Sequence, residues 1–275
     1  MKRVFATLFL AGLCATACND DFSQGWRIDK TRVLGARAVV DADPTRSSPA
    51  AGESFHVDWF VVSPGGPLTT NWRLTACRRA DVLRGVQCEG PSLTEVSGTS
   101  NAPSIGLTAP QSDTGYLLVS GDIDKTNVEY SVMLQTEKNG TNRNPRIEST
   151  DVRLRDITLT AEDGACDSLP QFLADGAKFN LELTVHDRDR EPIEGGRETM
   201  TLSHFTTAGK LERLYSALDG AAAAGDGVLS VPWEIKRDIN PPAAGLVVRF
   251  YFGLRDSRAG MDFATRAICV KPAPT

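Results

Sequence analysis

Residues 51–61 read AGESFHVDWFV, and residues 175–185 read DGAKFNLELTV. In both stretches a glycine is followed three residues later by a phenylalanine and then by apolar residues at every second position. Alternation with a period of two predicts a strand with one face in a core and the other toward solvent. Because the pattern occurs once in each half of the chain, it also predicts an internal repeat.

Similar alternation fills the rest of both halves, and Gly, Pro, Asn and Asp separate the apolar stretches. The predicted strands cover residues 31–40, 54–62, 71–77, 115–120 and 129–136, then 151–160, 178–185, 199–205, 227–233, 246–254 and 264–270. The alternation shifts by one residue within 151–160, which predicts a bulge. One short helix is predicted within 208–224, because its apolar residues recur at helical spacing: Leu211, Leu214, Tyr215 and Leu218.

The breaker-rich run KNGTNRNP at residues 138–145 predicts a domain boundary. We expect one domain over residues 26–138, a linker over 139–145 and a second domain over 146–275. Short strands at regular spacing predict an antiparallel β-sandwich in each domain. The glycine turn that leads into a core strand resembles the opening strands of immunoglobulin-like domains. The resemblance covers residues 27–137 and 146–271 and implies two tandem immunoglobulin-like sandwiches, without the antibody-type Cys…Trp…Cys core.

The first residues have the features of an export signal. A basic start, Met-Lys-Arg, precedes an apolar run that is too short to cross a bilayer, and small residues follow at 15–17. Residues 1–17 with Cys18 resemble a bacterial lipoprotein signal, which implies acyl chains such as palmitate on Cys18 and a tether over residues 18–25. An ordinary cleavage site after Ala17 remains the alternative, and it would leave Cys18 as a free thiol.

The predicted location follows from the residues after Cys18. Asn19 differs from the aspartate of the common inner-membrane retention signal, so the resemblance favours the outer membrane, on its periplasmic or surface side. The acidic residues at 20 and 21 leave the inner membrane open. Removal of residues 1–17 lowers the formal net charge from −5 to −7, because Lys2 and Arg3 are lost. This acidity argues against a nucleic-acid partner.

The four cysteines that remain after the lipidated residue predict disulfides in an oxidising compartment. Of the three possible pairings, the layout of the chain favours one bridge in each half, Cys77–Cys88 and Cys166–Cys269. Free buried thiols are the alternative. A zinc site is disfavoured because no histidine lies close in sequence to any of the four cysteines.

The sequence offers little that predicts catalysis. It lacks a Gly-x-Ser-x-Gly elbow, a phosphate loop and a His-Glu-x-x-His motif, and its three histidines fall in predicted strands or at their ends. We therefore predict no enzyme and no cofactor, with a hydrolase as the least favoured alternative. Among several acidic pairs, Asp187 and Asp189 could converge on calcium, but solvated turns, in which Asp side chains bond their own backbone, are the favoured explanation of such pairs.

The predicted function is protein binding or assembly in the cell envelope, through a membrane anchor and an apolar surface or a strand edge. A carbohydrate-binding or adhesive module is the alternative, because exposed tryptophans form platforms for sugars. Trp72 and Trp233 are the candidate binding residues for this alternative. Tight packing of both indoles would count against it.

The anchor gives the first testable prediction. Mass spectrometry of the N-terminal peptide, from protein purified out of its own membranes, should find acyl chains on Cys18. An unmodified Cys18 would contradict the lipoprotein interpretation and with it the predicted attachment.

Overall fold

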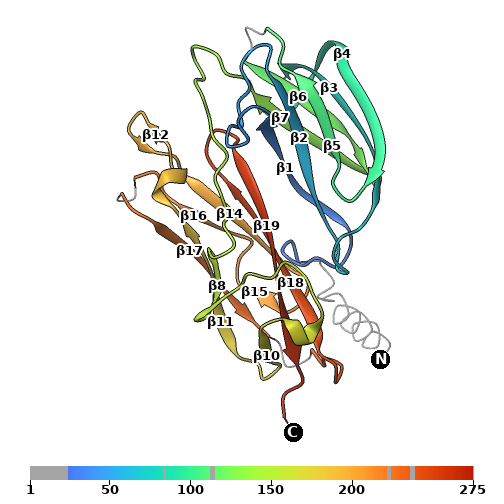
Figure 1. Cartoon of the computed structure of the whole chain (residues 1–275), viewed down its shortest axis with the longest axis vertical. Coiled ribbons are helices and arrows are strands. Elements are labelled where there is room, and N and C mark those ends of the chain that lie inside the picture. The colour runs from blue at the N-terminus through green and yellow to red at the C-terminus, as the bar shows by residue number, and fades with distance from the viewer. Residues whose placement is uncertain (1–23, 83–84, 112–114, 222–223, 236–238, 275) are drawn as a thin grey trace, which may run out of the picture.

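The computed structural model describes residues 24–274, apart from residues 83–84, 112–114, 222–223 and 236–238 (Figure 1). Cys18, the predicted signal segment and most of the tether lie outside these described residues. The described chain is mostly strand, and it contains no α-helix, only two short 3-10 turns, η1 (Cys166–Ser168) and η2 (Asp187–Asp189). It therefore holds no helix that is long and apolar enough to cross a membrane.

Seven strands form the first half of the structure, in two antiparallel sheets. One sheet has the order β1-β2-β5 and the other the order β4-β3-β6-β7. The strands are β1 (Arg32–Val40), β2 (Ser54–Val62), β3 (Thr70–Val82), β4 (Gly85–Ser100), β5 (Ser104–Thr108), β6 (Tyr116–Ile123) and β7 (Thr126–Met133). Alternate side chains of both sheets meet in one core, with Phe55 and Val57 of β2 facing Leu74 of β3 and Leu117 of β6. This half is a β-sandwich.

The second half has two five-stranded sheets around a separate core, in the orders β10-β19-β18-β14-β16 and β15-β17-β11-β8-β9. All their strand pairs are antiparallel except β10 with β19. The strands are β8 (Val152–Leu154), β9 (Ile157–Thr158), β10 (Gln171–Leu173), β11 (Lys178–Val185), β14 (Met200–Thr206), β15 (Lys210–Leu211), β16 (Tyr215–Leu218), β17 (Gly227–Glu234), β18 (Leu246–Arg255) and β19 (Met261–Lys271). A small hairpin, β12 (Pro192–Ile193) with β13 (Gly196–Arg197), stands apart from both sheets.

The internal repeat is visible in the backbone. β2 and β11 are the two strands that the repeated pattern predicts, and each has a partner strand on both sides. Gly52 and Gly176 hold the same left-handed conformation before them, with φ of +84° in each case. A residue with a Cβ is strained in that conformation, which explains a glycine at both places.

Two expectations about the second half were wrong. The described residues within 208–224 do not form a helix, because β15 and β16 occupy this region and β16 pairs with β14. Of the residues at helical spacing, only Leu211 is buried, whereas Tyr215 is 64% exposed. Residues 151–160 contain no bulge: β8 and β9 form a tight hairpin with Arg155 at a φ of 60°. The chain reversal, rather than an inserted residue, shifts the alternation.

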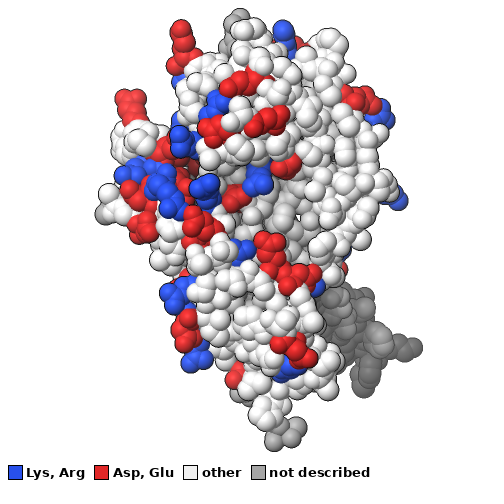
Figure 2. Space-filling model, viewed as in Figure 1, with Lys and Arg blue, Asp and Glu red and all other residues white. Residues whose placement is uncertain are grey.

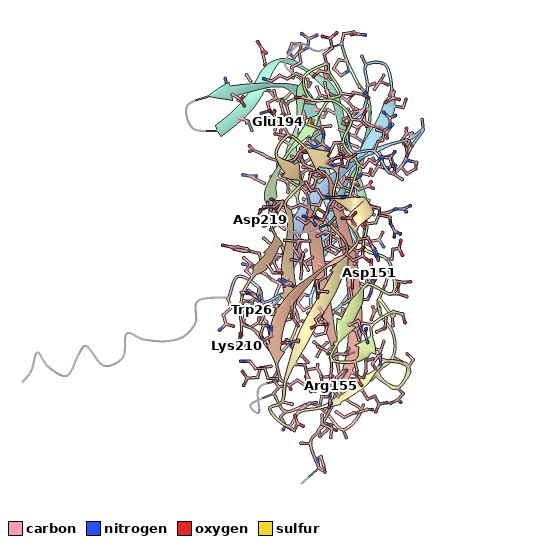
Figure 3. All side chains as sticks on the ribbon, turned by 90° about the vertical axis from the view of Figure 1, so that its left-hand side faces the viewer. Trp26, Asp151, Arg155, Glu194, Lys210 and Asp219 are labelled. Carbon is pink, nitrogen blue, oxygen red and sulfur yellow. A yellow bond between two sulfur atoms is a disulfide. The ribbon has the colours of Figure 1, made fainter. Side chains whose placement is uncertain are left out.

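The predicted boundary region runs between the halves without strands, and it is buried in part. Asn142 has no exposed surface, and its Nδ2 donates to Ser47 Oγ in the first half and to Asp256 Oδ2 in the second. The start of the described chain also contacts the second half, because the Ile28 N–H donates to the Thr206 carbonyl and Trp26 packs on that core (Figure 3). Contacts therefore cross between the halves at several places.

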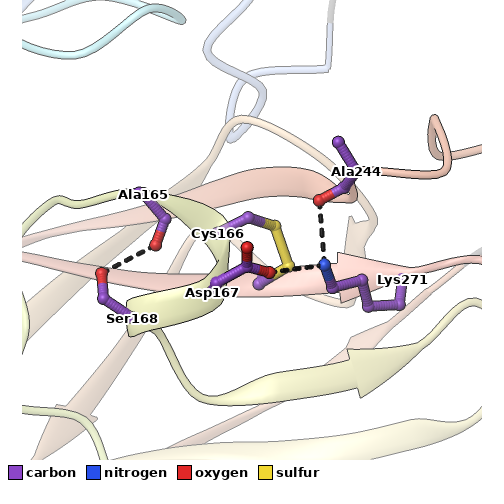
Figure 4. Close-up of a disulfide and its surroundings, with 7 residues drawn as sticks. Ala165, Cys166, Asp167, Ser168, Ala244 and Lys271 are labelled. Atoms are coloured by element: carbon purple, nitrogen blue, oxygen red, sulfur yellow. Dashed lines mark hydrogen bonds and ion pairs between the residues drawn. A yellow bond between two sulfur atoms is a disulfide. The ribbon is translucent and has the colours of Figure 1, made fainter.

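Both disulfides have the pairing that the sequence favours. Cys77 bonds to Cys88 within the β3–β4 hairpin, which projects beyond the sandwich (Figure 3). Cys166 in η1 bonds to Cys269 in β19 and ties the start of the second half to its last strand (Figure 4). Beside this bridge, Lys271 Nζ donates to Asp167 Oδ1 at 2.9 Å and to the Ala244 carbonyl at 3.0 Å.

Removal of the two disulfides should affect stability unequally. They join cysteines that are 103 and 11 residues apart in sequence. In the chain-entropy model, the double variant C166A/C269A should lose roughly 4–5 kcal/mol of unfolding free energy, and C77A/C88A about 3 kcal/mol. Both bridges include one fully buried cysteine, so each variant is a matched control for the other in urea unfolding. An equal or larger loss in C77A/C88A would contradict the prediction.

Candidate binding cleft between the two halves

Strand β2 has an open edge at its C-terminal end. β5 pairs with β2 only as far as Asp58, opposite Ser104, and the Trp59 N–H then donates to the Pro103 carbonyl at 3.0 Å. Beyond this point β2 continues to Val62 with β1 as its only strand partner. Strand alternation directs the N–H and C=O of Val61 to the same side as the Trp59 N–H. Among the described residues, a short length of backbone edge is therefore left without a partner where β5 ends.

A cleft of about 290 Å³ lies along this edge, between the two halves of the molecule. β2 and the loop that follows it supply one wall, and β18 with the loop before η1 supplies the other. Its apolar residues include Phe60, Val62 and Tyr251, and its charged ones are Glu162, Asp163 and Arg249. Clefts at the junction of two units are common binding sites.

Aromatic contacts hold the apolar wall in place. The Phe60 ring stacks on Phe263 with centroids 4.7 Å apart and meets Tyr251 edge-on at 6.1 Å. Tyr251 Oη donates to the Ser63 carbonyl at 2.7 Å, a bond from the second half to the first. Burial raises the pKa of Tyr251 to about 12, so its hydroxyl keeps the proton that makes this bond.

Arg249 holds the loop after β2 against the second half. Its guanidinium pairs with Asp163 at 2.7 Å and donates to the Pro64 carbonyl at 3.3 Å. Gly66 in this loop has a φ of +100°, and a Cβ there would lie 3.2 Å from Arg249 Nε. The close approach of the loop to Arg249 therefore requires glycine at this position.

Two buried N–H donors of the cleft residues have no hydrogen-bond partner in the part of the chain that the structure describes. They are Trp59 Nε1, on a side chain that is 5% exposed, and Arg249 Nε. A buried donor without an acceptor costs about 1–3 kcal/mol. An ordered water, or a carbonyl or carboxylate oxygen of a ligand, would remove that cost. The Trp59 ring packs in the core of the first half, so its donor lies behind the strand, whereas Arg249 lines the cleft. The cleft thus combines an apolar wall, an open strand edge and one donor, Arg249 Nε, that lacks an acceptor among the described residues.

The structure separates the two tryptophans that the sequence singled out. Trp233 has no exposed surface: its ring packs edge-on against Phe250 at 5.0 Å, and its Nε1 donates to the Ala208 carbonyl. The expectation that Trp233 is an exposed platform was therefore wrong, since it belongs to the core of the second half. Trp72 is only half-buried and lines a shallow groove at one end of the first half.

The acidic pair Asp187 and Asp189 lies in η2, and its members differ in surroundings. The Asp187 carboxylate accepts from the Gly225 N–H at 2.9 Å and pairs with Arg197 at 3.0 Å. Burial raises the pKa of Asp189 to about 6. A different group lies close by, Glu148, Asp151 and His186, with potential ligand atoms within 4.8 Å of one another. Glu148 already pairs with Arg188, which opposes a cation there.

Within the described part of the chain, neither His186 nor His204 meets both an acid and a hydroxyl. His186 lies between two carboxylates, with Nε2 3.0 Å from Asp151 and Nδ1 3.0 Å from Asp226. His204 Nε2 is 2.8 Å from Ser216 Oγ, and its Nδ1 has no partner in the described part of the chain. Burial lowers the pKa of His204 to about 3, which keeps the ring neutral.

Charges of both signs mix on the face drawn in Figure 2. Lys and Arg side chains lie next to Asp and Glu, and the largest blue area on this face has red atoms around it. This face therefore has no wholly basic area of the kind that binds a phosphate backbone.

Comparisons with known proteins give no family. No family model matches the sequence, and no curated protein matches it. Among solved structures, a red sea bream transglutaminase is 12% identical with a TM-score of 0.26, covering 89% of this chain and 32% of that one. The bacterial integrin-binding protein invasin is 12% identical with a TM-score of 0.25, covering 88% and 40%. The Yersinia pseudotuberculosis adhesin InvE is 10% identical with a TM-score of 0.23, covering 85% and 58%. The chain thus spans less than two thirds of each, and similarities this weak say nothing of family or function.

The His186 cluster predicts a pH-dependent contribution to stability. Burial lowers the pKa of His186, but hydrogen bonds to Asp226 and Asp151 outweigh it, so the pKa lies above its usual value. A raised histidine pKa stabilises the fold at low pH, and this stabilisation is lost as the pH rises through the folded-state pKa.

The variant D226N should therefore lower the pKa of His186, measured by NMR titration. Its loss of unfolding free energy should be greater at pH 5 than at pH 8. D156N, which removes an exposed carboxylate at another turn, is the control. A loss that is independent of pH would contradict the assigned ion pair.

Proposed function

We propose that this protein is a non-enzymatic lipoprotein of the cell envelope, built from two tandem immunoglobulin-like sandwiches and anchored through Cys18, that binds a partner protein. The partner places an extended segment in the cleft between the halves. The observation that carries this proposal is the open edge of β2 beside an apolar wall and Arg249 Nε, a buried donor that lacks an acceptor among the described residues.

The proposed contact is strand addition. A segment that lies along β2 pairs with the free N–H and C=O of Val61, in the position that β5 occupies earlier on the strand. One of its carbonyl or carboxylate oxygens accepts from Arg249 Nε. An apolar side chain packs on Phe60 and Tyr251, and a basic side chain faces the exposed carboxylate of Glu162.

Other features agree with a binding protein of the envelope. Two disulfides suit an oxidising compartment. His186 has acids around it and no hydroxyl within hydrogen-bond reach, and His204 has a hydroxyl and no acid, among the described residues. An outer-membrane location on the periplasmic or surface side follows from the resemblance of the N-terminus to lipoprotein signals.

A blocking variant tests the site directly. Ala102 is an exposed cleft residue, so A102W should fill the cleft without disturbing either core. Full-length wild type and variant are purified from native membranes in mild detergent, and the bound proteins are compared by mass spectrometry. The control is A221W, at an exposed alanine in the loop after β16. A stoichiometric partner should be lost with A102W and kept with A221W. A partner that both variants retain would remove the cleft from the proposal.

A further inference from the structure

The turn between β18 and β19, residues 256–260, lies against the first half of the molecule. Tyr130 Oη of β7 donates to the Ala259 carbonyl at 3.0 Å, which joins the turn to the first sandwich. A Cβ at Gly260 would come within 2.5 Å of the Arg143 carbonyl oxygen, so the turn also touches the boundary region between the halves. We call this turn the joint, because contacts from both halves meet at it.

The joint contains a buried carboxylate whose hydrogen-bond donors are all uncharged. Asp256 is 7% exposed. Its Oδ1 accepts from the N–H groups of Arg258 and Gly260 at 2.7 and 2.8 Å, and its Oδ2 accepts from Asn142 Nδ2 at 3.1 Å. Among the described residues, no cationic side chain forms an ion pair with this carboxylate. Burial of a charge without an opposite charge is costly, so the site favours the protonated, neutral carboxyl group.

The cation of the joint is bound by two other carboxylates. Arg258 Nε pairs with Glu198 and its Nη2 pairs with Glu191, both at 2.6 Å. Glu198 has no exposed surface, and burial raises its pKa although Arg258 opposes the shift. The charge of Glu198 also acts on Asp256, whose pKa is raised to about 7, first by burial and then by this charge. Two buried carboxyl groups thus share the surroundings of one guanidinium.

Two further titratable or charged residues adjoin the joint within the described part of the chain, Tyr130 of β7 and Arg143 of the boundary region. The Tyr130 hydroxyl is uncharged, since burial raises its pKa, and the Arg143 side chain is exposed to solvent. Asn142 bridges Asp256 and Ser47, and its Oδ1 is buried without a donor among the described residues. Acceptors therefore outnumber donors on this side of the joint, which again favours a proton on Asp256.

We propose that Asp256 makes the contact between the two halves depend on pH. The carboxyl group keeps a proton while the joint is closed, and it releases this proton to solvent as the pH rises. The resulting carboxylate meets the charge of Glu198 without a cation of its own, so the joint opens more often and water reaches it. Asp256 in an open joint has an ordinary pKa near 3.8, so the closed joint is favoured most below that pH. This preference is lost as the pH rises to about 7, and a further increase has no effect. The inference does not rest on the cleft or on the protein partner.

Hydrogen–deuterium exchange of the full-length protein in mild detergent tests this proposal. Mass spectrometry follows peptides that cover residues 139–145 and 256–262, and each rate is divided by that of the unfolded peptide at the same pH. A single proton changes the opening equilibrium by up to about tenfold per pH unit. The protection of both segments should therefore fall at least about tenfold between pH 5 and pH 7, and it should stay level from pH 8 to pH 9. Equal protection at pH 5 and pH 7 would overturn the proposal.

Three variants assign the effect to Asp256. D256N cannot ionise, so its protection at the joint should be the same at pH 5 and pH 7. E198Q removes the neighbouring charge, so Asp256 should lose its proton at a lower pH and the fall should end earlier; this variant decides the question even if D256N does not fold. D226N, which removes a carboxylate partner of His186 in another cluster, should keep the wild-type fall. An unchanged fall in E198Q or in a folded D256N would overturn the proposal, as would loss of the fall in D226N.

Discussion

The structure depends on the burial of both faces of β2 at its C-terminal end. Trp59 packs into the core of the first half, while Phe60 and Val62, which point the opposite way, pack with Tyr251 of the second half. A strand with one face toward water would alternate apolar and polar residues, and residues 59–62 do not. Because the second half covers the outer face, the halves join here. β5 ends before residues 59–62, so this part of β2 has no strand on its second edge, and the cleft lies along that edge.

The junction also has buried polar contacts. Through them, residues 139–145 are bonded to both halves and do not form a solvent-exposed linker. Asn144 Nδ2 donates to the Ala38 carbonyl in the first half, and its Oδ1 accepts from the Met261 N–H in the second. Burial, with the nearby charge of Glu198, raises the pKa of Asp256 to about 7, although Asn142 and two backbone N–H groups bond to its carboxylate. Such a network is costly when it is only partly made, so it favours one arrangement of the two halves.

Sequence patterns predicted what depends on local periodicity and missed what depends on neighbours. The repeat located β2 and β11 because a strand with one buried face leaves a period of two. β4 was missed because most of its side chains are exposed and no alternation marks it. The prediction of a helix within 208–224 was wrong because the spacing of apolar residues does not show which of them the neighbouring strands cover. Trp72 and Trp233 look alike in sequence, and only the sheet around each decides that one lines a groove and the other is core. The run Trp-Phe-Val-Val was the one local sign of the junction.

The short open edge of β2 differs from the long edge of β4 in how it is protected against pairing with another strand. Strand β4 lies at the edge of its sheet over 16 residues, yet its register with β3 shifts between Ala76 and Arg78, and residues 90–93 have no partner there. Gly90, at a φ of +73°, begins this interruption and Pro91 lacks an N–H, so another strand cannot pair along the whole of β4. At β2 the opposite holds: the edge is only a few residues long, but a wall of the second half stands beside it. Backbone bonds to so short an edge give little affinity by themselves. A segment that binds there must also supply side chains and acceptors that fit the wall, which makes the site selective rather than a general point of aggregation.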